Sequence, residues 1–86
     1  MKLRSKFIIH HTEDESLLVP AGGAGFAGLV KGNKTFGAIL DLLKSEISEA
    51  EIVSALCARF DAPEAVIAKD VRKALAELRA VGALDE

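Results

Sequence analysis

The feature that most constrains this chain is the helical periodicity of the 54 residues from Asn33 to Glu86. The first helix-start signal is Asn33, whose side chain can cap a helix from Lys34 to about Lys44. Its apolar residues recur at i, i+3, i+4 and i+7, namely Phe36, Ile39, Leu40 and Leu43. Such a helix has one apolar face, which it buries against other parts of its domain.

A second helix is expected after Ser48. Ser48 and Glu51 form a capping box, in which each side chain accepts a hydrogen bond from the other residue's backbone amide. The apolar stripe that follows comprises Ile52, Val53, Leu56, Cys57 and Phe60. Cys57 lies in this stripe, where cysteine behaves as a small hydrophobic residue, so we expect a buried thiol and no nucleophile.

The third and longest helix is expected to end at Gly82. Asp61 and Glu64 repeat the capping pattern, and Pro63 suits a first turn because its missing N–H is not needed there. The residues expected to face the core are Val66, Ile67, Val71, Ala74, Leu75 and Leu78.

The chain up to about Val30 has a different character. The short apolar runs KFIIHH, SLLVP and GFAGLV are separated by TEDE and by the Gly-rich PAGGAG, which predicts three short strands joined by turns. In the first strand Phe7 and Ile9 would share one face, with Ile8 on the other. The predicted fold is therefore α+β: one domain over residues 1–86, winged helix-turn-helix-like, with three short antiparallel N-terminal strands followed by three helices.

Composition narrows the function classes. Eleven Lys and Arg against thirteen Asp and Glu give a net charge of −2, which argues against a nucleic-acid binder. One cysteine cannot form an intramolecular disulfide, and neither a signal-peptide core nor an 18-residue apolar run is visible. We therefore expect a cytoplasmic protein that binds neither nucleic acid nor membrane.

Candidate chemical motifs are weak. The stretch from Gly23 to Gly28 matches G-x-G-x-x-G, but the sequence predicts a strand where that motif needs a helix. We interpret these glycines as a turn and a strand edge that another backbone can approach. His10 and His11 would point to opposite faces of a strand, and no Ser-His-Asp set is recognisable. No enzyme, cofactor or metal site is expected.

The polar side of the third helix carries charges of both signs. They are Lys69, Asp70, Arg72, Lys73, Glu77 and Arg79. A helix that recognises DNA would need amide or hydroxyl side chains to contact base edges, and this helix has none. A solvated face with ion pairs such as Lys73 to Glu77 is the alternative interpretation.

Three blocks of sequence in order, GNKTFGAILDLL, ISEAEIVSALCARFDAP and DVRKALAELRAVGAL, together with the order of elements, resemble the pyrroloquinoline quinone biosynthesis protein D family. Gly32 and Leu40 depart from it, standing where the family usually has Leu and Trp. The resemblance implies a recognition element that binds the leader of a ribosomally made precursor peptide. It also implies delivery to a modifying enzyme, often a radical S-adenosylmethionine enzyme.

In that family the leader adds as a strand to the third strand and lies against the third helix. Carried over to this chain, the peptide-binding residues would be Phe26, Ala27, Gly28, Leu29, Val30, Lys69, Arg72, Lys73, Ala76 and Arg79. Acidic leader residues would meet Arg72 or Arg79. Two alternatives stay open: a winged-helix DNA-binding regulator, and an interaction subunit that forms a homodimer through its edge strand.

Overall fold

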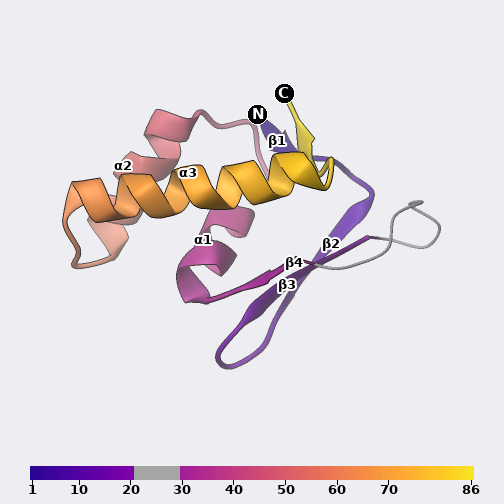
Figure 1. Ribbon diagram of the computed structural model, residues 1–86, viewed down its shortest axis with the longest axis horizontal. Coiled ribbons are helices and arrows are strands. Elements are labelled where there is room, and N and C mark those ends of the chain that lie inside the picture. The colour runs from indigo at the N-terminus through magenta and orange to yellow at the C-terminus, as the bar shows by residue number, and fades with distance from the viewer. Residues whose placement is uncertain (21–29) are drawn as a thin grey trace.

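A computed structural model describes residues 1–20 and 30–86 and confirms the predicted α+β fold (Figure 1). The described elements are β1 (Lys2–Leu3), β2 (Phe7–His11), β3 (Ser16–Pro20), β4 (Val30–Gly32), α1 (Lys34–Leu42), α2 (Glu49–Arg59), α3 (Glu64–Ala80) and β5 (Leu84–Asp85). Strands β2, β3 and β4 form an antiparallel sheet in that order, and the three helices follow in the chain.

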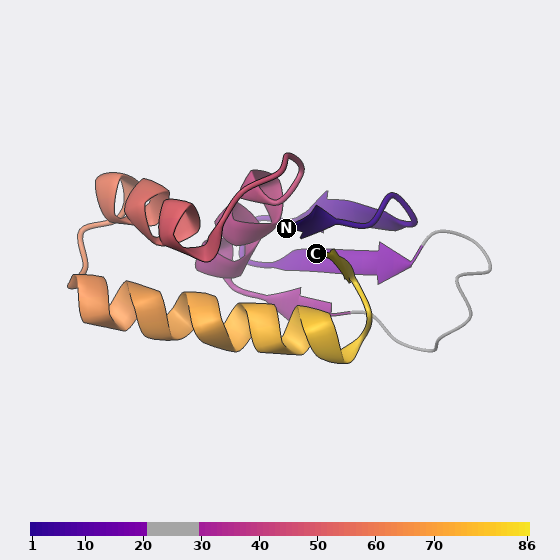
Figure 2. The ribbon, with the colours of Figure 1, turned by 90° about the horizontal axis from the view of Figure 1, so that it is seen from above.

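Helix α3 lies beside the edge of the sheet. Figure 2 shows β4 between β3 and α3, with α1 continuing from the end of β4 and α2 packed along the first half of α3. The described part of the third strand is Val30–Gly32, so it includes Lys31 and Gly32, which the sequence analysis placed after the strand. None of the helices in residues 1–20 and 30–86 is long and apolar enough to cross a membrane.

The first helix follows its sequence signals. The Asn33 side chain accepts a hydrogen bond from the Phe36 amide at 3.0 Å, and the four predicted apolar residues of α1 are all buried. Ile9 and Phe7 pack against the core while Ile8 is 56 % exposed, which confirms the predicted alternation in β2. Leu18 of β3 is buried against this core and fixes the sheet onto α1.

The capping box of α2 is also confirmed. The Glu51 amide donates to Ser48 Oγ at 3.1 Å, and the Ser48 amide donates to Glu51 Oε1 at 3.0 Å. Within the predicted stripe Ile52 and Leu56 are fully buried, whereas the other three residues pack only partly on the core. Cys57 is thus half-buried, and the expectation of a buried thiol is correct only in part.

Two predictions for the start of α3 are wrong. Pro63 is the N-cap and makes no side-chain cap bond. Glu64 is then the first helical residue, two positions before the N3 position that the reciprocal bonds of a capping box require. Val66 is 49 % exposed and not part of the core, because it lies on the helix row that continues through Asp70, Lys73 and Glu77.

The predicted stop at Gly82 is confirmed. Gly82 has φ +70°, a conformation in which glycine has no steric penalty. The Ala83 amide donates to the Leu78 carbonyl at 2.9 Å and the Gly82 amide to the Arg79 carbonyl at 3.1 Å, the pair of bonds that defines a Schellman cap. This cap turns the chain back so that Leu84 is buried.

The two ends of the chain pair with each other, which the sequence analysis missed. Strand β1 is antiparallel to β5, with Lys2 opposite Asp85 and Leu3 opposite Leu84. The Leu3 amide also donates to the Leu43 carbonyl at 2.9 Å, so this small sheet is tied to the end of α1. Strands of two residues are too short to show an alternating pattern in sequence.

Candidate functional site

The candidate site begins at the free edge of β4. The Thr12 amide donates to the Glu15 carbonyl at 2.8 Å, which makes this pair a hydrogen-bonded pair of the antiparallel ladder. Hydrogen-bonded and non-hydrogen-bonded pairs alternate, so the register puts Leu17 opposite Lys31 in a non-hydrogen-bonded pair. The N–H and C=O of Lys31 therefore point away from β3, toward an edge of the sheet that pairs with no other strand of residues 1–20 and 30–86.

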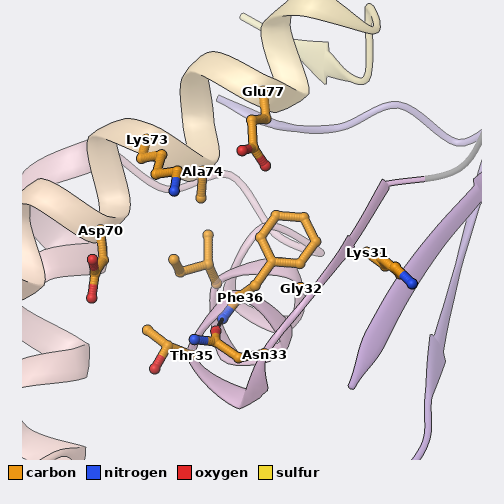
Figure 3. A pocket seen from close by; sticks show the side chains of 10 residues that line it. Lys31, Gly32, Asn33, Thr35, Phe36, Asp70, Lys73, Ala74 and Glu77 are labelled. Atoms are coloured by element: carbon orange, nitrogen blue, oxygen red, sulfur yellow. Dashed lines mark hydrogen bonds between the residues drawn. The ribbon is translucent and has the colours of Figure 1, made fainter. Parts of the chain in front are cut away.

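A cleft of about 200 Å³ lies between this edge and α3 (Figure 3). We call it the β4–α3 cleft; it is lined by Lys31, Gly32, Asn33, Thr35, Phe36, Ile39, Asp70, Lys73, Ala74 and Glu77. Its floor is apolar, because Phe36, Ile39 and Ala74 are buried members of the core that also line the cleft. The cleft thus joins an apolar surface to a strand edge with unused backbone hydrogen-bonding groups.

Gly32 shapes the floor of this cleft. A Cβ at Gly32 would lie 2.6 Å from both Cβ and Cγ of Phe36. Real Cβ atoms do not approach other carbons so closely, so the phenyl ring can take its position only because residue 32 has no side chain. The departure from the family's usual Leu at this position is therefore linked to the placement of Phe36.

The rim on the α3 side carries charges. Asp70, Lys73 and Glu77 are exposed, and no ion pair joins any of them within residues 1–20 and 30–86. The ion pair between Lys73 and Glu77 suggested by the sequence is thus not formed. In Figure 3 the Lys73 amino group and the Glu77 carboxylate project from α3 on the side of the Phe36 ring, whereas the Lys31 amino group lies on the far side of β4.

The predicted site residues are distributed unequally. Phe26, Ala27, Gly28 and Leu29 lie outside the described residues, and Val30 begins β4. On α3 Lys73 lines the β4–α3 cleft. The other four predicted residues of α3 are exposed but do not line it, namely Lys69, Arg72, Ala76 and Arg79. Their role in binding stays a prediction.

Arg79 has an intramolecular partner. Its guanidinium donates to the Glu86 carboxylate through Nε at 3.2 and 3.1 Å and through Nη2 at 2.9 Å. The hydrogen bond to Glu86 raises the pKa of Arg79, and the hydrogen bond from Arg79 lowers the pKa of the Glu86 carboxyl. An acidic peptide residue would have to compete with Glu86 for this guanidinium.

Most residues of the cleft were not predicted from the sequence. Lys31, Asn33, Phe36, Asp70 and Glu77 line it and were not predicted as site residues. The sequence could have indicated Asp70 and Glu77. Residues 70, 73 and 77 are spaced i, i+3 and i+7, so these two lie on the same row of the helix as the predicted Lys73. The periodicity identified the core face of α3 but not which of its flanks borders the sheet.

A second hollow lies between the β2–β3 hairpin, α1 and the end of α2. We call it the hairpin hollow; its lining residues are His11, Thr12, Glu15, Ser16, Lys34, Gly37, Ala38, Asp41, Arg59 and Phe60. Here His11 Nδ1 lies 2.7 Å from Ser16 Oγ and His11 Nε2 lies 3.0 Å from Asp41 Oδ1. The structure thus assembles a Ser-His-Asp chain that the sequence analysis did not find, because residue 41 comes close only through packing of α1.

The Ser16–His11–Asp41 set links the β2–β3 hairpin to α1. Ser16 is only 3 % exposed, and a Cβ at Gly37 would lie 2.1 Å from Ser16 Oγ, so the hydroxyl is enclosed against the α1 backbone. A carbonyl substrate could not reach it. Burial raises the pKa of Asp41, but hydrogen bonds and charges from His11 and Lys44 outweigh this and the net pKa is lowered. The described ranges 1–20 and 30–86 contain no cluster of His, Cys, Asp or Glu suited to a metal ion.

The family model described as coenzyme PQQ synthesis protein D (PqqD) matches residues 17–84. The chain belongs to the PqqD family. The match includes β4, α1 and α3, and therefore every residue that lines the β4–α3 cleft.

Among solved structures, the PqqD-family chain is similar to TbiB1, determined in complex with the TbiA(β) leader peptide. The TM-score is 0.74 at 24 % sequence identity, and the alignment covers 99 % of this chain and 100 % of that chain. The two chains therefore share a fold along their full lengths. No curated protein matches the sequence significantly.

Proposed function

We propose that this PqqD-family protein is a non-catalytic adaptor that binds the leader of a ribosomally synthesised precursor peptide by strand addition to β4. The observation that carries the proposal is the free edge at Lys31, which borders a cleft with an apolar floor. Strand addition needs both features, since backbone hydrogen bonds provide affinity and side-chain pockets provide selection. The fold shared with TbiB1, a protein solved with a leader peptide, supports the same ligand class.

The proposed second partner is the enzyme that modifies the precursor. The family resemblance favours a radical S-adenosylmethionine enzyme in this role. The adaptor would hold the leader between β4 and α3 while the rest of the precursor extends to that enzyme. A homodimer formed through the β4 edge would compete with the leader for the same backbone groups, so peptide binding should dissociate such a dimer.

The test replaces Lys31 with proline. Proline removes the N–H that faces the free edge, while the bonds of Val30 and Gly32 to β3 are retained. Losing one backbone hydrogen bond of about 1 kcal/mol is expected to weaken leader binding about five- to tenfold. The probe is a synthetic leader peptide of the precursor encoded beside this gene, labelled for fluorescence anisotropy.

Lys31→Ala is the matched control. It removes the exposed side chain but keeps the backbone N–H, so it is expected to bind the leader within about twofold of the unchanged protein. Equal binding by the folded Lys31→Pro variant would overturn strand addition at β4. Binding of a DNA duplex with a steep salt dependence, and no binding of leader, would favour the regulator instead.

A further inference from the structure

The charged rim of the β4–α3 cleft suggests which leaders it accepts. Going from the start of α3 toward its end, the cleft side carries a negative, a positive and a negative side chain, at Asp70, Lys73 and Glu77. None of the three forms an ion pair with another described residue, so their charges are available to a ligand in the cleft that they line. Resting on the proposed function, we propose that the cleft selects a leader segment with an acidic residue two positions before a basic residue.

The spacing along α3 supports a two-residue interval. Glu77 lies four positions after Lys73, which is a rise of about 6 Å along the helix axis. In a β-strand, two side chains on the same face are separated by about 6.6 Å. Consecutive cleft-facing side chains of an added strand would therefore lie beside Lys73 and Glu77 in turn.

The directions of the elements set the order of the two charges. In Figures 1 and 2, β4 runs toward the start of α1 while α3 runs the opposite way, so the two are antiparallel. Both strand pairings of this sheet are antiparallel, and an antiparallel pair is slightly more stable per residue than a parallel one. A strand added antiparallel to β4 then runs in the direction of α3 and reaches Lys73 before Glu77. The residue beside Lys73 should be acidic, and the residue two positions later should be basic.

The same rim disfavours a purely acidic leader. Asp70 and Glu77 flank Lys73 on the cleft side of α3, so a run of acidic residues would bring like charges together at two of three positions. Exchanging the acidic and basic residues of a leader replaces two attractions with two repulsions. Because each exposed ion pair of this kind contributes only weakly, the two orders should differ about tenfold in affinity.

The experiment selects binders from a random library of peptides about twelve residues long, displayed on their own mRNA. Selection on the unchanged protein is expected to enrich the acidic-x-basic order. Selection on the double variant Lys73→Glu with Glu77→Lys, which keeps the net charge, is expected to enrich basic-x-acidic. Lys6→Glu is the control, because it makes the same substitution at an exposed residue that neither lines the cleft nor belongs to the predicted peptide-binding residues. Lys69→Glu separately tests the flank of α3 that was predicted from the sequence.

The outcomes separate this inference from the proposed function. Two results would overturn the inference and leave strand addition intact. In the first, the selected peptides lose affinity for Lys31→Pro but show no preferred order of acidic and basic residues. In the second, the charge-exchanged variant enriches the same order as the unchanged protein. An enriched basic-x-acidic order on the unchanged protein would overturn it as well. Selected peptides that bind Lys31→Pro as tightly as the unchanged protein would overturn the proposed function itself. A Lys69→Glu variant that changes the enriched order would shift the contact to the flank predicted from sequence and so contradict the inference.

Discussion

The two hollows on either side of α1 contain similar kinds of polar groups but use them differently. In the hairpin hollow, His11 contacts both Ser16 and Asp41, so the polar groups satisfy one another inside the protein. In the β4–α3 cleft, the backbone of Lys31 and the side chains of Asp70, Lys73 and Glu77 are directed to the open space. Mutually satisfied groups hold two elements together, whereas groups without an internal partner are available to a ligand.

The hairpin hollow also shows that a Ser-His-Asp set joined by hydrogen bonds need not be catalytic. The hydrogen-bond distances resemble those of a nucleophile and its base, but the serine is enclosed against Gly37. Exposure of the reacting atom, and not distance alone, decides what such a set can do. Substitutions in the hairpin hollow should therefore change stability, and substitutions in the cleft should change binding.

The largest expected effect in the hairpin hollow comes from Gly37→Ala. In most helices this change is stabilising by up to about 1 kcal/mol. Here the added Cβ would clash with Ser16 Oγ and press on Ser16 Cβ at 3.0 Å, so we expect the free energy of unfolding to fall by about 2–3 kcal/mol. Urea denaturation measures this loss.

The double variant Ser16→Ala with Gly37→Ala is the check on that mechanism. Removing Oγ relieves the closest contact, so the double variant should be less destabilised than the sum of the two single variants. Simple additivity would mean that the clash between the hairpin and α1 is not the cause of the loss.

A smaller effect is expected from His11→Ala. It leaves the buried Ser16 hydroxyl without its side-chain partner and breaks the link to Asp41, at a cost of about 1–2 kcal/mol. His10→Ala is the matched control: the ring of this exposed histidine has no hydrogen-bond partner among residues 1–20 and 30–86, so its removal should cost less than about 0.5 kcal/mol. Leader affinity should stay within about twofold for both; a large loss for His11→Ala would mean that the two hollows are coupled.

The smallest effect concerns acid stability. The pKa of Asp41 is lowered in the folded protein from its usual 3.8, so its contribution to stability is present above that value and is lost as the pH falls through the folded pKa. Because the carboxylate is 41 % exposed, solvent screening limits this contribution to less than about 1 kcal/mol. Asp41→Asn should remove this part of the acid dependence, measured as thermal unfolding from pH 6 to pH 2. An unchanged acid dependence would show that the link to His11 has no electrostatic role.

Local signals predicted the helices well. Asn33 and the Ser48–Glu51 pair act on amides within three residues, so their effect is visible in a short stretch of sequence, and the same is true of the Gly82 stop. The core face of α1 followed from spacing alone. Asp61 and Glu64 matched the same capping pattern, yet the helix begins at Glu64 because Pro63 occupies the N-cap.

The site was harder to predict because it depends on contacts between distant segments. Nothing in the sequence near Asp70 or Glu77 shows that β4 lies beside that flank of α3 and not beside Arg72. The pairing of β1 with β5 and the approach of Asp41 to His11 likewise join residues far apart in the chain. Local periodicity therefore located the helices, while tertiary packing determined which of their polar residues border a cleft.

Amide NMR with hydrogen exchange on the labelled protein, with and without its leader peptide, tests strand addition to β4. We expect the Lys31 amide to become protected from exchange and shifts to gather at β4 and at residues 70–77 of α3. The amides around His11 and Ser16 should be unchanged. A leader that binds without protecting Lys31, or that shifts the hairpin hollow instead, would contradict the central claim that the open edge beside the β4–α3 cleft is the binding site.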